Sequence, residues 1–150
     1  MATADRKVTC GDVIAIYRPK LVDGIPTYNL RFEHQGKKSK WLELQNRVED
    51  FDLFSPDCSR VMLLKSRYGP VDVVSVKRLD AYLHGAKPDF VLTGDRSTDG
   101  ITSTGVFRDG SWLSNDEVAY TWGCCDPPIT TTYTLSTGKK RRQFAPSEAH

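Results

Sequence analysis

Long apolar runs are absent from this chain of 150 residues, and histidine occurs only three times. No segment approaches the roughly 18 consecutive apolar residues of a transmembrane helix, so the sequence predicts no membrane span. The first ten residues are polar and have no apolar core, which predicts that there is no secretory signal. With 39% apolar and 27% charged residues, the composition is that of a globular protein. We therefore expect an intracellular protein of one domain or two very small ones.

Cysteine is sparse, and none of the four residues forms a C-x-x-C pair: Cys10, Cys58, Cys124 and Cys125. In an intracellular protein this pattern predicts reduced structural thiols. A zinc site assembled from cysteines and histidines distant in sequence is the alternative. Structural zinc normally shows paired ligand spacing, however, so the sequence predicts no cofactor.

Catalytic signatures are lacking too, since the chain has no G-x-S-x-G, P-loop or H-E-x-x-H pattern. The spacing of 95–100 matches the start of a calcium-binding loop, but Val106 stands where such a loop has its bidentate glutamate. The surrounding residues resemble one repeat of FG-GAP-like propellers, and no second copy follows at a fixed period. We expect a plain Asp/Gly turn here and a protein that is not an enzyme.

Positive charge is unevenly distributed, although the net charge is only +2. Residues 1–88 carry 15 Lys/Arg and 11 Asp/Glu, whereas residues 89–138 carry 2 and 7. A basic cluster follows at Lys139, Lys140, Arg141 and Arg142. The chain is thus basic, then acidic, and ends in a basic segment, a polarity that suits an anionic partner.

Short apolar segments with alternating polar residues, separated by Gly, Asp and Pro turns, predict a mainly-β fold. The expected strands are Asp12–Tyr17, Tyr28–His34, Ser39–Leu44, Val61–Leu64, Val71–Val76, Phe90–Leu92, Gly105–Phe107, Val118–Trp122 and Ile129–Leu135. Arg18-Pro19 is expected to end the first strand, because proline lacks the amide that a ladder needs. His34-Gln35-Gly36-Lys37 predicts a hairpin turn, and Asp109-Gly110 predicts another turn.

One short helix is expected over 76–84, where Val76, Leu79, Tyr82 and Leu83 share a face and Gly85 follows. A single long strand over 71–79 is the competing interpretation. The expected architecture is a small barrel or two packed barrels over residues 8–136, with a boundary near 55–60. From 137 to 150 no apolar periodicity remains, which predicts a flexible basic tail.

The first half of the sequence contains one pattern that is similar to a known protein family. It consists of Tyr28-x-Leu30-x-Phe32, a polar turn, and then Trp41-Leu42-x-Leu44. Over residues 11–92 it resembles the Royal-family modules, which include Tudor and chromo-barrel domains, and is most similar to their SAWADEE form. The resemblance implies Tudor-like barrels in a chromatin protein that binds methylated lysine in an aromatic cage. The cage candidates are Tyr17, Tyr28, Phe32 and Trp41, and the alternative is that these rings fill the core.

From these patterns the sequence predicts a non-enzymatic binding module that reads modified or cationic peptide tails. The basic cluster 139–142 supports a second hypothesis, in which the basic half and tail associate with nucleic acid or serve nuclear import. A viral structural or assembly protein would explain a β domain with a basic end equally well.

Overall fold

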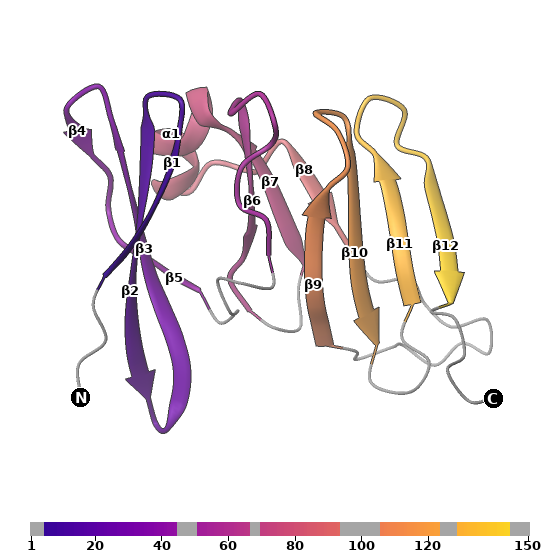
Figure 1. Ribbon diagram of the computed structural model, residues 1–150, viewed down its shortest axis with the longest axis horizontal. Helices are drawn as coiled ribbons and strands as arrows, with labels where there is room; N and C mark the ends of the chain where they lie inside the picture. The colour runs from indigo at the N-terminus through magenta and orange to yellow at the C-terminus, as the bar shows by residue number, and fades with distance from the viewer. Residues whose placement is uncertain (1–4, 45–50, 67–69, 94–105, 124–128, 145–150) are drawn as a thin grey trace.

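Three antiparallel sheets follow one another along the chain and stack as layers (Figure 1). The computed structural model describes residues 5–44, 51–66, 70–93, 106–123 and 129–144. The N-terminal sheet contains β1 (Arg6–Cys10), β2 (Val13–Val22), β3 (Ile25–His34), β4 (Lys37–Lys38) and β5 (Leu42–Leu44). The central sheet contains β6 (Arg60–Leu64), β7 (Val71–Ser75) and β8 (Phe90–Leu92). The C-terminal sheet contains β9 (Val106–Trp112), β10 (Glu117–Gly123), β11 (Ile129–Thr134) and β12 (Lys140–Phe144).

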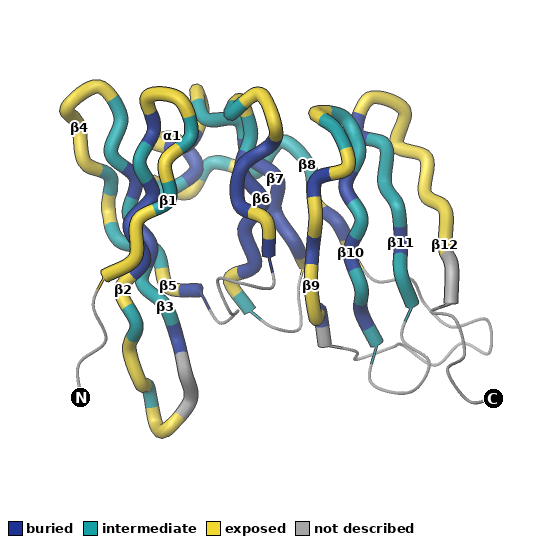
Figure 2. Tube along the Cα trace, viewed as in Figure 1, coloured by how far each residue is buried: buried dark blue, intermediate teal, exposed yellow. Residues whose placement is uncertain are grey.

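The central sheet is buried on both faces, and the buried residues gather between the layers (Figure 2). Its side chains alternate between two separate cores. Val61, Leu63 and Val74 pack toward the N-terminal sheet, whereas Met62, Leu64, Val71 and Val73 pack toward the C-terminal sheet. A strand buried on both faces reads as a continuous apolar run, which β6 shows over Val61–Leu64, whereas the buried Asp72 interrupts the run in β7.

The prediction of a mainly-β fold with one short helix is confirmed. A 3-10 turn, Val76–Arg78, leads into α1 (Leu79–Leu83) within the range expected for the helix. Gly85 ends it at a φ of +108°, a backbone conformation that glycine adopts without strain. The described strands form three separate sheets where the sequence suggested barrels, because apolar faces on both sides of the central sheet require a cover on each side.

One predicted strand end, at Arg18-Pro19, and one predicted turn, at Asp109-Gly110, lie inside strands. β2 continues through Pro19, which is accepted because β1 pairs with β2 only as far as Tyr17, and beyond it no strand among the described residues pairs with this side of β2. Asp109-Gly110 lies within β9. A Cβ on Gly110 would come 2.9 Å from both Met62 Sδ and a Phe51 ring carbon, so this glycine permits a close approach of the layers.

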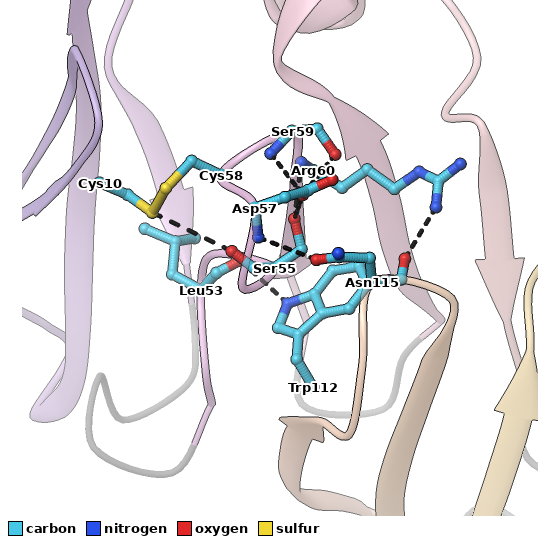
Figure 3. Close-up of a disulfide and its surroundings, with 9 residues drawn as sticks. All are labelled: Cys10, Leu53, Ser55, Asp57, Cys58, Ser59, Arg60, Trp112 and Asn115. Carbon is cyan, nitrogen blue, oxygen red and sulfur yellow. Dashed lines mark hydrogen bonds between the residues drawn. A yellow bond between two sulfur atoms is a disulfide. The ribbon is translucent and has the colours of Figure 1, made fainter.

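A disulfide joins Cys10, at the end of β1, to Cys58, in the turn before β6 (Figure 3). The expectation of reduced thiols is therefore wrong for this pair. The β1–β2 hairpin brings Cys10 beside that turn, with the two Cα atoms 5.5 Å apart. Sequence spacing cannot show such a contact between residues 48 positions apart. Cys124 and Cys125 lie outside the described residues.

The same turn also binds the C-terminal sheet. The Asp57 backbone N–H donates to Asn115 Oδ1 at 2.8 Å, and Arg60 Nη1 donates to the Asn115 carbonyl at 2.9 Å (Figure 3). The Asp57 carboxylate accepts hydrogen bonds from the side-chain hydroxyls of Ser59 and Ser55, which lower its pKa. One short turn thus links all three layers.

Candidate functional site

The predicted aromatic cage is not formed, because its members lie on different faces of the N-terminal sheet. Tyr17 and Phe32 are each only 3% exposed and belong to the core. Tyr28 packs on the same core and meets Tyr17 edge to face, with ring centroids 6.4 Å apart. These three rings therefore fill the space between layers, as the alternative interpretation had it.

Trp41 lies on the opposite face. The guanidinium groups of Arg18 and Arg31 lie 4.7 and 4.5 Å from the centroid of its ring. Each arginine is next to a core residue on its strand, and successive side chains point to opposite sides of a sheet. Both guanidinium groups therefore lie on the face away from the core. The cation–π capacity of Trp41 is thus engaged by the protein's own arginines.

The sequence predicted that the basic cluster belongs to a flexible tail. The structure differs, because Lys140–Phe144 form β12. Lys140, Arg141 and Arg142 pair in register with Tyr133, Thr132 and Thr131 of β11, and Lys139 directly precedes the strand. Backbone pairing needs no apolar side chain, so a segment without apolar periodicity can still complete a sheet. All four basic residues are exposed, and residues 145–150 lie outside the described range.

A pocket lies between the β3–β4 hairpin and the helical segment after β7. Its volume is about 660 Å³. Phe32, Val76 and Leu79 supply apolar surface, and the first and last of these are buried in the core. Seven polar residues complete the lining: His34, Gln35, Lys37, Lys38, Ser39, Lys77 and Asp80.

Positive charge dominates the rim of this hairpin–helix pocket. Lys37 and Lys77 are exposed, and within the described residues neither has a carboxylate within 4 Å. Lys38 lies 3.9 Å from Glu33, and His34 Nε2 lies 3.1 Å from Asp12 Oδ2. The two lysines therefore offer ammonium groups beside an apolar floor.

Local sequence fixes both walls of the pocket. Gln35 and Gly36 have φ values of 52° and 77°, which makes the tight turn that places Lys37 opposite His34. Ser39 then interrupts β4, because its hydroxyl accepts the Phe32 N–H at 2.9 Å while its own N–H donates to the Phe32 carbonyl. This irregularity opens the space beside Phe32.

Asp89 holds the opposite wall. Its carboxylate accepts the Ser75 backbone N–H and a hydrogen bond of 2.5 Å from Arg78 Nη1. Burial works to raise the pKa of Asp89, but these hydrogen bonds outweigh it and leave the pKa below the ordinary value. The start of the helical segment is thereby anchored, and Lys77 is positioned at the pocket.

Sequence reasoning missed this pocket although it predicted both of its walls. The hairpin at 34–37 and the helix at 76–84 were each visible as local patterns, but nothing in the sequence shows that they face each other. Among the residues that the structure describes, no three His, Cys, Asp or Glu side chains gather closely enough to hold a metal ion. In the same residues, no helix has the length and apolarity to cross a membrane. The calcium-loop candidate at 95–100 lies outside them.

No protein-family model and no curated protein matches the chain. Among solved structures, Hsv2p of Kluyveromyces lactis is similar at 11% identity and a TM-score of 0.33, over 97% of this chain and 72% of that one. A form of KlHsv2 with loop 6CD replaced by a Gly-Ser linker is similar at 12% identity and a TM-score of 0.32, over 95% and 67%. At TM-scores this low, neither likeness bears on the fold or the function of this chain.

Proposed function

We propose that this chain is a non-enzymatic binding module whose hairpin–helix pocket binds an acidic peptide segment bearing an apolar side chain. The observation that carries the proposal is the placement of Lys37 and Lys77 beside an apolar floor without a carboxylate partner of their own among the described residues. The pocket volume of 660 Å³ suits a few side chains, because ligand pockets span roughly 300–1,000 Å³.

The sign of the rim favours an anionic ligand over the methylated or cationic tail that the family resemblance implies. A lysine side chain entering this pocket would meet three ammonium groups and a single carboxylate, that of Asp80. Like charges at such a rim repel a ligand and slow its approach, whereas opposite charges accelerate association. An acidic side chain would reach the lysines while its apolar neighbour covers the floor.

The test is fluorescence anisotropy with a labelled peptide in which one phenylalanine is flanked by glutamates. A matched peptide with lysines in place of the glutamates and a trimethyllysine peptide serve as alternative ligands. Lys37→Gln and Lys77→Gln should each weaken binding of the acidic peptide by about three- to tenfold, since each removes one charged contact. Lys87→Gln is the control, because Lys87 is also exposed but does not line the pocket.

Each outcome bears on the proposal. Selective binding of the acidic peptide that weakens in both pocket variants and not in the control supports it. Preference for the trimethyllysine peptide would contradict the proposal and would favour the hypothesis that the protein binds methylated lysine. Equal binding by all four proteins would show that the peptide lies elsewhere and would overturn the assignment of this pocket.

A further inference from the structure

The disulfide connects two segments that lead directly to the two walls of the hairpin–helix pocket. On the hairpin side, Cys10 pairs with Val13 of β2, and Val13 pairs in turn with His34, which lines the pocket. Asp12 Oδ2 also lies 3.1 Å from His34 Nε2. Cys10 is therefore tied to the wall that carries Lys37, since Lys37 pairs with His34 across the hairpin.

The other end of the disulfide leads to the helical wall. Cys58 lies in the turn before β6, and the carbonyl of the next residue, Ser59, accepts the Val76 backbone N–H at 2.8 Å. Val76 lines the pocket and directly precedes Lys77, the lysine of that wall. The route from one wall to the other through the disulfide thus consists of covalent bonds and short backbone hydrogen bonds.

The second connection between these walls is apolar packing. Among the described strands, no backbone ladder joins the N-terminal sheet to the central sheet. Phe32 and Leu79, one from each wall, belong to the same core, and the Phe32 and Phe54 rings meet edge to face with centroids 6.5 Å apart. Hydrophobic attraction is not directional, so it holds the layers together but restricts their relative position less than a covalent bond does.

We propose that the Cys10–Cys58 disulfide is a redox-controlled clamp on the hairpin–helix pocket, so that the oxidised protein binds the acidic peptide more tightly than the reduced protein. This inference rests on the proposed function, because it concerns the regulation of the same pocket. In the oxidised protein the clamp holds Lys37 and Lys77 on walls of fixed separation. A site that is already arranged for its ligand loses less conformational entropy on binding, which raises its affinity.

Release of the clamp is a thiol–disulfide exchange with a dithiol reductant. A thiolate of the reductant attacks one sulfur to form a mixed disulfide, and its second thiolate then displaces the protein sulfur. The two electrons come from the dithiol, whose sulfurs become a disulfide, and each protein cysteine gains one proton. Both cysteines are half-buried beside the exposed residues Gly11 and Ser59. The Ser55 carbonyl lies 4.0 Å from Cys10 Sγ and can accept the hydrogen bond of the reduced thiol.

The experiment measures binding of the labelled peptide with one phenylalanine between glutamates, before and after reduction with dithiothreitol. The protein carries Cys124→Ser/Cys125→Ser, so that one pair of cysteines remains. Reduction should weaken binding by about three- to tenfold, the change expected when one or two side chains must be ordered by the ligand. Reoxidation with oxidised glutathione should restore the original affinity.

Two further variants in the same background separate the clamp from a general loss of stability. Cys10→Ser/Cys58→Ser should bind as weakly as the reduced protein and should not respond to dithiothreitol. Gly110→Ala keeps the disulfide but crowds Met62 and Phe51, away from the pocket. It should bind as tightly as the oxidised parent and respond to dithiothreitol as the parent does. Circular dichroism verifies that each protein is folded at the temperature of the titration.

Amide hydrogen exchange tests the clamp without a ligand. Reduction should accelerate exchange of two N–H groups by about tenfold or more, because local opening becomes easier when the walls are released. These are the Val76 N–H, which donates to the Ser59 carbonyl, and the Phe32 N–H, which donates to Ser39 Oγ at the hairpin. Amides of β10, which is paired on both sides, should keep their rates.

The outcomes distinguish this inference from the proposed function. If the oxidised protein binds no peptide, the proposed function fails, and faster exchange on reduction supports the clamp while unchanged exchange overturns it. If the peptide binds with the same affinity before and after complete reduction, the clamp is overturned whatever the exchange rates. Equal weakening in Gly110→Ala, or unfolding of the whole protein on reduction, would also overturn it and leave the disulfide a purely structural bond.

Discussion

The Cys10–Cys58 disulfide should account for a large part of the stability of this protein. It closes a loop of 48 positions, and the loss of chain entropy on closing such a loop corresponds to about 4 kcal/mol at 25 °C. The link also joins β1, whose side chains are mostly exposed, to the turn that contacts the other two layers. We expect Cys10→Ser/Cys58→Ser to fold with a free energy of unfolding lower by about 3–4 kcal/mol.

Urea unfolding followed by tryptophan fluorescence measures this change. With a slope of about 2 kcal/mol per molar urea, the midpoint should fall by roughly 1.5–2 M. Both proteins carry Cys124→Ser and Cys125→Ser, so that no other thiol can exchange with the pair. Cys58 has a φ of 64°, so Cys10→Ser/Cys58→Gly should recover up to about 1 kcal/mol of the loss.

Two results would refute this reasoning. One is a loss below about 1 kcal/mol with an unchanged slope, which would mean that the closed loop is already restricted in the unfolded chain. The other is detection of two free thiols in the denatured, unreduced Cys124→Ser/Cys125→Ser protein, which would mean that the bond does not form.

Three further predictions concern the layers. Gly110→Ala should lower the unfolding free energy by about 1–3 kcal/mol, because the new methyl group would overlap Met62; calorimetry measures the loss, and an unchanged melting temperature contradicts the close approach. Tyr82→Phe should cost about 1–3 kcal/mol in urea titrations, because the Tyr82 hydroxyl donates to the buried Asp72 carboxylate at 2.5 Å; a neutral result would show that water replaces it. Asp57 has a lowered pKa in the folded protein, so its stabilising effect is present above its unfolded pKa of about 3.9 and is lost as the pH falls through the folded value. Asp57→Asn should therefore lose less stability than the wild type between pH 6 and pH 3, and parallel pH profiles would contradict this.

The sequence was most informative where structure is local. Alternation in Val118, Tyr120 and Trp122 predicted a half-buried strand, and all three side chains point into the core. The helix at 76–84 was recognisable because its apolar period changes and Gly85 follows. Such patterns depend on a few consecutive residues and need no knowledge of the rest of the chain.

The site was less accessible from the sequence because it depends on contacts between distant segments. Lys37 and Lys77 line one pocket although 40 positions separate them, which no periodicity can reveal. The failure of the aromatic cage did have a local signal. Leu42 pairs with the core residue Leu30 of β3 and packs against the same core. Trp41 directly precedes Leu42, so the alternation of side chains predicts that the Trp41 ring lies on the other face of the sheet.

Residues 137–144 of the predicted flexible tail form a turn and a strand for a different reason. Gly138 has a φ of 71° and donates its N–H to the Thr134 carbonyl, so the chain reverses and returns along β11. β12 pairs with β11 through its backbone, and Lys140, Arg141 and Arg142 are exposed. Such a strand shows no alternation of apolar and polar residues in its sequence. Composition therefore described the surface of this segment and not its conformation.

Because the central sheet packs against both outer sheets, the chain cannot be shortened by a whole sheet without exposing apolar residues. A fragment that lacks the N-terminal sheet would expose Val61, Leu63 and Val74, and one that lacks the C-terminal sheet would expose Met62 and Val73. Either exposed face is a broad apolar surface on β-strands, the kind of surface that drives aggregation. Cutting at 55–60, where the sequence suggests a domain boundary, would separate two halves of one core, so expression and isotope labelling are best designed around the whole chain.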